Sequence, residues 1–151
     1  MEIKYNNLYT HFVFTTSERY PCIEPQHRER IEKYITGIIN NRQCKLYAVY
    51  ANPEHIHFLV SRSPTMSEEE LANQVAEASE AFINQNHLCN GRFHWQSSCS
   101  AFSVSKKDVD KVCKYILNQP EHHKTQSYDE EWETFLKFYQ TGMPENKGRI
   151  D

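Results

Sequence analysis

Apolar and polar residues along the chain follow two patterns, and each pattern predicts one kind of secondary structure. Runs rich in aromatic and β-branched residues predict four β-strands. These runs cover residues 8–14, 46–51, 55–61 and 101–104. Apolar residues that recur at spacings of three and four predict amphipathic helices. These stripes cover about residues 25–43, 67–86, 105–119 and 128–139.

Polar residues between the runs predict how several elements begin. Asn52-Pro53-Glu54 separates the second and third strands and predicts a β-hairpin turn, because proline cannot donate to a strand ladder. Ser67 followed by Glu70, and Ser105 followed by Asp108, have the spacing of a helix capping box. Both serines are therefore expected to cap the helices that follow them.

The order of these elements predicts the fold. Strand, helix, hairpin, helix, strand and helix form an α+β order, and the two long helical connections suit a split βαβ arrangement. We therefore expect a ferredoxin-like antiparallel sheet with helices packed on one face, plus a C-terminal helix. At 151 residues the chain fits a single domain, 1–151, in which residues 142–151 form a loose C-terminal tail.

Composition and charge narrow the function classes. Hydrophobic residues make up 38% of the chain and charged residues 25%, as is typical of folded soluble proteins. The chain shows no signal peptide and no membrane-spanning run, so we expect a cytoplasmic protein without a membrane partner. Five scattered cysteines without a Cys-x-x-Cys pair argue against a disulfide framework or a zinc knuckle. With a net charge of −3, any nucleic acid must be bound by a local basic patch.

The third predicted strand contains a pair of candidate metal ligands, His55 and His57. Side chains alternate along a strand, so both imidazoles lie on one face while Ile56, Phe58 and Val60 take the other, core face. The histidines then lie on a surface that helices on the core face do not cover. The alternative interpretation is a pair of partly exposed strand histidines that hydrogen-bond to backbone or water.

The third predicted helix carries a candidate nucleophile, Tyr115, with a neutral oxygen ligand, Gln119, one turn later. Val112 and Ile116 belong to the buried stripe, which places Tyr115 on the exposed side, where it is alternatively an ordinary surface tyrosine. A phenol attacks a phosphodiester well only when the developing charge is neutralised, and a divalent ion on two imidazoles and an amide oxygen does this. Pro120 disfavours helical geometry at the residue before it, so Gln119 is expected on a frayed turn.

Together, His55-Ile56-His57 and Tyr115 with Gln119 resemble the histidine-hydrophobic-histidine (HUH) and tyrosine-x-x-x-glutamine motifs of the single-tyrosine transposases of small bacterial insertion sequences. Further segments are similar to that family in the same order, over most of residues 8–139. They are Thr10-His11-Phe12-Val13-Phe14-Thr15-Thr16, Phe93-His94-Trp95-Gln96, Ala101-Phe102-Ser103-Val104-Ser105 and the run 115–123. The repeat-associated tyrosine transposases are relatives of the same kind.

This resemblance implies an activity and a set of roles. Such proteins are homodimeric ferredoxin-like DNA transposases that bind single-stranded DNA hairpins at element ends and cut through a 5′-phosphotyrosine intermediate. It implies that His55, His57 and Gln119 bind a divalent metal, Mg²⁺ or Mn²⁺, and that Tyr115 is the nucleophile. No nucleotide cofactor is expected, because each step exchanges one phosphoester for another. In many members the helix that bears the tyrosine completes the site of the partner subunit, and the sequence leaves open whether Tyr115 acts in cis or in trans.

DNA contacts are expected from cations and aromatics near the proposed site, although each lysine is alternatively part of a solvated helix face. The candidates are Arg19, Arg92, Trp95, Lys106, Lys107 and Lys111, with His94, Lys114 and Lys124 also available. His122-His123 is either a further metal or phosphate contact or, as we expect after a proline that ends a helix, a pair of polar loop histidines.

Two other functions compete with transposition. One is an inactive relative that binds structured single-stranded nucleic acid without cutting it. The other is a metal-dependent phosphodiesterase that uses water, which would leave Tyr115 without a role.

Overall fold

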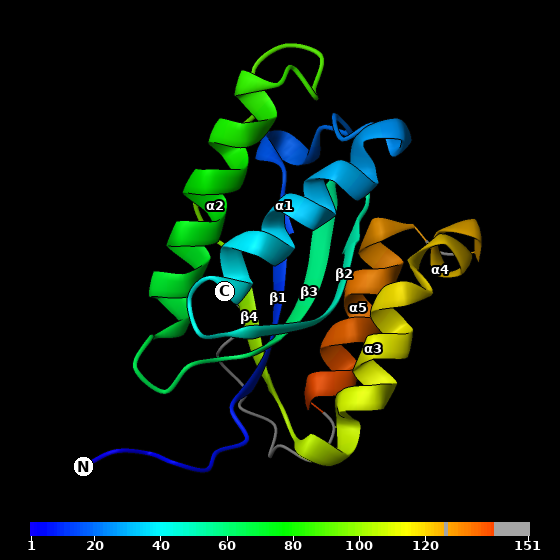
Figure 1. Ribbon diagram of the computed structural model, residues 1–151. Helices are drawn as coiled ribbons and strands as arrows, with labels where there is room; N and C mark the ends of the chain where they lie inside the picture. The colour runs from blue at the N-terminus through cyan, green and yellow to red at the C-terminus, as the bar shows by residue number, and fades with distance from the viewer. Residues whose placement is uncertain (126, 141–151) are drawn as a thin grey trace. The chain divides into compact units, whose positions relative to one another are not determined.

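The computed structural model describes residues 1–125 and 127–140, so the predicted tail at 142–151 lies outside the described residues. The four strands are β1 (Tyr9–Thr15), β2 (Lys45–Ala51), β3 (His55–Ser61) and β4 (Ser100–Val104). They form one antiparallel sheet in the order β2-β3-β1-β4, with β3 and β1 in the centre (Figure 1). The ferredoxin-like sheet is confirmed, and each strand begins and ends within one residue of its prediction.

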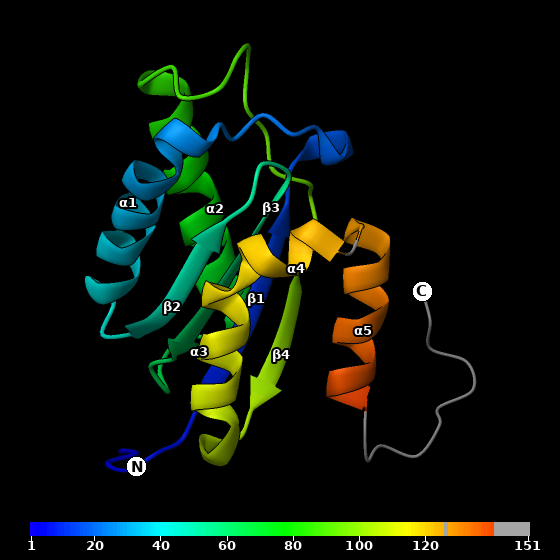
Figure 2. The same ribbon diagram turned by 90° about the vertical axis from the view of Figure 1, so that its right-hand side faces the viewer.

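Two helices, α1 (Arg28–Asn40) and α2 (Glu68–Gln85), cover one face of this sheet (Figures 1 and 2). Their apolar stripes meet the central strands in a continuous hydrophobic core. Fully buried members of that core include Phe12, Phe58, Ile31, Ile35, Leu71 and Val75. The predicted core-facing stripes of both helices are confirmed. Three short 3₁₀ turns complete the description up to residue 108: η1 (Ser17–Arg19), η2 (Pro25–His27) and η3 (Lys106–Asp108).

The two predicted capping boxes have different outcomes. The hydroxyl of Ser67 accepts a hydrogen bond from the backbone N–H of Glu70 at 3.1 Å, so the cap of α2 is confirmed. Ser105 instead donates its hydroxyl to the carboxylate of Asp108 at 2.9 Å and makes no side-chain cap. The second prediction is wrong because the chain there enters the 3₁₀ turn η3 before the α-helix begins.

Helix α3 (Val109–Leu117) contacts β2 and β3 from the side opposite to α1 and α2, as both views show (Figures 1 and 2). It buries Val109, Val112 and Ile116. The second face of the sheet is thus partly covered by α3, which bears on the site described below.

Glu32 ties α1 to β2 through a buried carboxylate. It accepts a hydrogen bond from the backbone N–H of Ala51 at 2.9 Å and pairs with Arg28 at 2.9 Å. Burial raises the pKa of this carboxyl above its ordinary value of 4.5, and the two partners oppose that rise.

The chain divides into two compact units, Met1–Leu117 and Asn118–Asp151. The described part of the second unit contains α4 (Gln119–Thr125) and α5 (Tyr128–Gln140). Rings at 128, 132, 135 and 139 contact one another in sequence along α5, with centroids 4.9 to 6.4 Å apart. The predicted C-terminal helix is confirmed. None of the helices described in either unit is long and apolar enough to cross a membrane.

The predicted single helix over residues 105–119 is wrong at its end. Helix α3 stops at Leu117, and the carbonyl of Asn118 accepts the backbone N–H of Glu121 at 3.1 Å to begin α4. Pro120 lies in the first turn of α4, where its missing N–H has no helical partner to lose. Pro120 is therefore compatible with a helix that begins at Gln119.

Candidate active site

The histidines of His55-Ile56-His57 lie on the face of β3 that points away from α1 and α2, as the strand pattern predicts. Ile56, Phe58 and Val60 are in the hydrophobic core between sheet and helices, which leaves the alternate residues for the other face. His55 is only 1% exposed and His57 only 2%. The prediction of the face is correct, but both histidines are buried and do not lie on an open surface.

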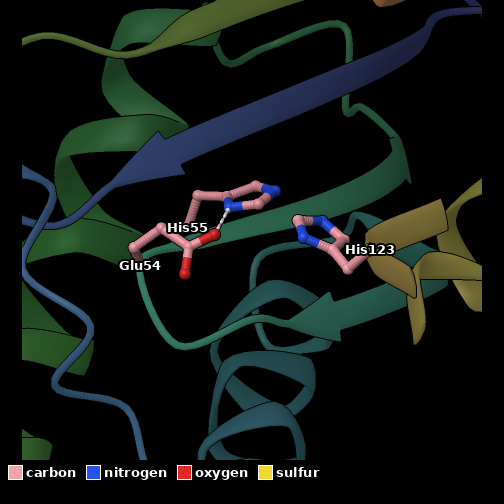
Figure 3. A group of neighbouring side chains, drawn as sticks. All are labelled: Glu54, His55 and His123. Atoms are coloured by element: carbon pink, nitrogen blue, oxygen red, sulfur yellow. Dashed lines mark hydrogen bonds and ion pairs between the residues drawn. The ribbon is translucent and has the colours of Figure 1, made fainter. Parts of the chain in front are cut away.

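Both ring nitrogens of His55 have a partner within the hairpin. Nδ1 lies 2.8 Å from Oε1 of Glu54, a hydrogen bond drawn in Figure 3. Nε2 lies 3.2 Å from the amide nitrogen of Asn52. An amide N–H can only donate, so Nε2 accepts, and Nδ1 carries the proton that it donates to the carboxylate. Asn52 and Glu54 therefore set the orientation of the ring from both ends.

His57 has a histidine partner, His11 of β1. Nδ1 of His57 lies 3.0 Å from Nε2 of His11, and the latter residue is fully buried. The pairing of β1 with β3 brings them together, because Val13 is the residue directly opposite His57 and His11 is its diagonal neighbour. The rings of His55 and His57 are themselves 5.0 Å apart. Three histidines thus share one buried face of the two central strands.

Tyr115 joins this face from α3. Its ring centroid lies 5.8 Å from that of His57 and 6.5 Å from that of His11. The tyrosine is half-buried, where sequence periodicity predicted an exposed side chain. The difference arises because α3 is covered by the sheet over a broader arc than the stripe of Val112 and Ile116 alone.

The donors on this face fit a divalent cation. Nδ1 of each histidine contacts Glu54 or His11, so Nε2 is the atom through which each ring would bind a metal. At His55 the positive end of the Asn52 N–H points to that Nε2 lone pair and stands in for the cation. Neutral imidazole nitrogens are common ligands of divalent transition metals.

Gln119 belongs to the second unit, where it is the first residue of α4. Its amide oxygen lies 3.2 Å from Nε2 of His123, and the same nitrogen lies 2.8 Å from Oε2 of Glu131 in α5. Gln119, His123 and Glu131 therefore form one polar cluster within this unit. The expectation that His122 and His123 are loop residues is wrong, because both lie in α4.

The candidate DNA contacts fall into two groups. Those exposed are Arg19, Arg92, Lys106, Lys107, Lys111 and His94, of which the lysines follow one another along η3 and the start of α3. Trp95 is different, because it is only 8% exposed and its indole N–H donates to Ser79 at 3.0 Å. Its ring contacts Phe14 and Phe93 in the core, so we leave it out of the proposed DNA contacts.

Sequence reasoning missed the roles of His11, Glu54 and Glu131 around these side chains. For His11 a signal was present, since Phe12 and Phe14 lie on the core face of β1 and so place it on the other face, with His55 and His57. Glu54 was read only as a turn residue. Glu131 meets His123 through the packing of α5 on α4, for which the sequence offers no signal.

Comparison with known proteins agrees with this geometry. The family model described as "Transposase IS200 like" matches residues 4–119, which include both histidines, Tyr115 and Gln119. A comparison with curated proteins gave no match.

Two solved structures share the fold. A candidate transposase from Deinococcus radiodurans R1 is 19% identical, with a TM-score of 0.58, over 79% of this chain and 96% of that one. A REP-associated tyrosine transposase bound to a REP hairpin is 15% identical, also with a TM-score of 0.58, over 82% of this chain and 74% of that one. The fold, the histidine pair with its tyrosine and the family match together show that this chain belongs to the IS200-like transposase family.

Proposed function

We propose that the protein cleaves and rejoins single-stranded DNA at hairpin-bearing element ends by metal-assisted transesterification. The Oη atom of Tyr115 attacks the scissile phosphorus, and the bond from phosphorus to the 3′ oxygen breaks. A 3′-hydroxyl leaves, and the 5′-phosphate stays on the tyrosine. Attack of a 3′-hydroxyl on that phosphotyrosine reverses the exchange and joins two ends. The observation that carries this proposal is the contact of the Tyr115 and His57 rings on one buried face.

The metal ligands in this proposal are His55 and His57 through Nε2, with the amide oxygen of Gln119 as the third. A bound Mg²⁺ or Mn²⁺ would stabilise the negative charge that develops on the non-bridging oxygens of the phosphate. Because all three ligands are neutral, they leave the full charge of the cation for that purpose. No nucleotide takes part, since the number of phosphoester bonds is unchanged.

The proposed substrate is a DNA hairpin with a single-stranded flank. One of the structural neighbours is described as bound to a REP hairpin, which supports the same class of ligand here. Arg19, Arg92, Lys106, Lys107 and Lys111 are exposed and supply cationic contacts for the phosphates in a chain of net charge −3. We place this activity in the cytoplasm, where chromosomal DNA is accessible in bacteria.

We further propose a homodimer in which Tyr115 acts in cis. The family resemblance supports the dimer, and the cis assignment rests on the proximity of Tyr115 to His57 of its own chain. Mixing Tyr115→Phe with His57→Ala tests this assignment. In trans, a mixed dimer would hold one intact site and cleavage would return, whereas in cis no combination restores it. Size-exclusion chromatography with light scattering measures the assembly itself.

The decisive experiment incubates the protein with Mn²⁺ and a labelled hairpin substrate and resolves the products on a denaturing gel. We expect a covalent protein–DNA adduct that is absent in Tyr115→Phe and after chelation of the metal. Tyr34→Phe is the matched control, because this half-exposed tyrosine stacks on Phe82 on the other side of the sheet. Binding without any adduct would identify a non-cleaving relative, and an adduct that persists in Tyr115→Phe would overturn the proposed nucleophile.

A further inference from the structure

We propose that Glu54 and His11 are positioning residues that fix the tautomers of His55 and His57, so that both rings present Nε2 to a cation. This inference rests on the proposed function in that it names the cation as a metal ligated by the two histidines. It concerns two side chains to which neither the motif nor the nucleophile assigns a role.

The contacts that Glu54 and His11 make with the two histidines of β3 are alike. Glu54 holds Nδ1 of His55 at 2.8 Å, and His11 holds Nδ1 of His57 at 3.0 Å. An imidazole whose Nδ1–H is donated keeps its lone pair on Nε2. Nε2 therefore carries the lone pair in both rings, although one partner is a carboxylate and the other a neutral imidazole.

The second step is the rigidity of both partners. The carbonyl of Glu54 accepts two hydrogen bonds from Thr16, from its backbone N–H at 2.9 Å and from its hydroxyl at 3.1 Å. His11 lies in β1, which is paired with β3 on one side and β4 on the other, and it is fully buried. These bonds fix the backbone from which each partner side chain extends. A fixed backbone narrows the positions that each side chain can take.

The third step is that the two partners act differently on their ligands. A carboxylate that accepts the Nδ1–H of a ligating histidine raises the electron density on Nε2 and strengthens the bond to a cation. A neutral imidazole orients the ring but supplies no charge. His57 can serve as ligand only when His11 acts as the acceptor, which requires the proton of His11 to lie on its own Nδ1.

The test measures tautomers directly in the full-length, metal-free protein. Long-range ¹H–¹⁵N correlation spectra of ¹⁵N-histidine-labelled protein at pH 8 distinguish Nδ1–H from Nε2–H rings, and His55→Gln and His57→Gln assign the signals. We expect the Nδ1–H form for both rings. An Nε2–H form of either ring in the wild-type protein would overturn the proposal, whether or not the protein cleaves DNA.

Variants then separate the two partners. Because the amide N–H of Asn52 also favours the Nδ1–H form of His55, Glu54→Ala is combined with Asn52→Ala, and this double variant is expected to release the tautomer of His55 alone. His11→Phe is expected to release that of His57 alone, so each variant is the internal control for the other. Mn²⁺ or Co²⁺ titration by calorimetry is expected to show about 10- to 100-fold weaker binding in each. Glu54→Gln and His11→Gln keep an acceptor oxygen, so they should retain the wild-type tautomers. If Glu54→Ala or His11→Phe does not fold, the corresponding Gln variant is measured in its place.

One further control and two outcomes complete the design. Glu24→Gln removes an exposed carboxylate 4.0 Å from His27, a pair of the same kind outside the site, and should leave metal affinity unchanged. If Glu54→Ala abolishes metal binding while the His55 tautomer stays as in the wild type, Glu54 is itself a ligand and the proposal is wrong for it. If both tautomers are as expected but no adduct forms with DNA, the proposed function fails and the positioning roles stand.

Discussion

Along the two central strands, β1 and β3, both faces of the sheet are buried, but their side chains differ in chemistry. On the helix-covered face Phe12 stacks on Phe58 with centroids 5.1 Å apart, and the surroundings are apolar. On the other face of the same two strands, His11 contacts His57 and both approach Tyr115. Burial of an aromatic ring stabilises the fold by removing apolar area from water, whereas burial of an imidazole costs free energy unless a hydrogen bond compensates.

This difference teaches that burial alone does not tell a core residue from a site residue. The hydrogen-bonded face holds polar groups in a water-poor setting, where hydrogen bonds fix their orientation and electrostatic interactions are stronger than in water. The apolar face supplies the rigidity on which that orientation depends. Substitutions in adjacent residues of β3 should therefore separate activity from stability.

The largest effect is expected from His57→Ala. Loss of one imidazole should weaken metal binding and slow adduct formation roughly 10²- to 10³-fold. The free energy of unfolding should fall by about 1–3 kcal/mol, because buried His11 loses its hydrogen bond with His57. Gel-based rates and urea unfolding measure the two effects. If the free energy of unfolding fell sharply while the rate of adduct formation per folded molecule stayed at the wild-type value, the two faces would not differ in the way described.

The opposite pattern is expected from Phe58→Ala, one residue along the strand. Removal of this fully buried ring should cost about 3–5 kcal/mol of unfolding free energy. The rate of adduct formation by the protein that remains folded at low temperature should change little. Phe58→Leu is the matched control and should lose less stability. A large loss of rate in both variants under folding conditions would break the comparison.

A smaller effect is expected where a polar bond lies inside the apolar face. The indole N–H of Trp95 donates to the hydroxyl of Ser79 at 3.0 Å. In a double-mutant cycle of Trp95→Phe and Ser79→Ala, we expect a coupling energy of about 0.5–1.5 kcal/mol from chemical denaturation. DNA binding should be unaffected once folding is accounted for. Loss of hairpin affinity in Trp95→Phe at full folding would restore the indole as a DNA contact.

The smallest effect is a pH dependence of stability from Glu32. Burial raises the pKa of this carboxyl in the folded chain, so the folded state holds a proton that the unfolded state releases from about pH 4.5 upward. The unfolding free energy contributed by Glu32 is therefore complete below pH 4.5 and falls as pH rises through the folded pKa. Compared with Glu32→Gln, the wild-type protein should lose relative stability over that window. A relative gain with rising pH would contradict the effect of burial.

The sequence was sufficient for the strands, the first two helices and the face of the histidine pair. These follow from periodicities of two and 3.6, which depend on the chain locally. The motif also led to Tyr115. Its exposed position was predicted wrongly, because the arc of a helix that a sheet covers depends on tertiary packing and not on the stripe of one helix.

Several contacts of the candidate residues are not encoded by local pattern. The His11–His57 bond depends on the register of β1 against β3, and the cluster of Gln119, His123 and Glu131 depends on the packing of α5 against α4. At Pro120 the local rule favoured a helix end over a helix start, and both are ordinary sites for proline. The candidate residues could thus be named from the sequence, whereas their hydrogen-bond partners could be identified only from the structure.

The two-faced pattern of the central strands also has a consequence for how the chain folds. A slip of one residue between β1 and β3 would turn the side chains of one strand to the opposite face. His11, or the pair on β3, would then face Phe12 and its neighbours without hydrogen-bond partners, and an aromatic ring would be exposed in their place. The histidines therefore penalise any slip between β1 and β3 by an odd number of residues. Their position on one face also opposes mispairing of the strands while the chain folds.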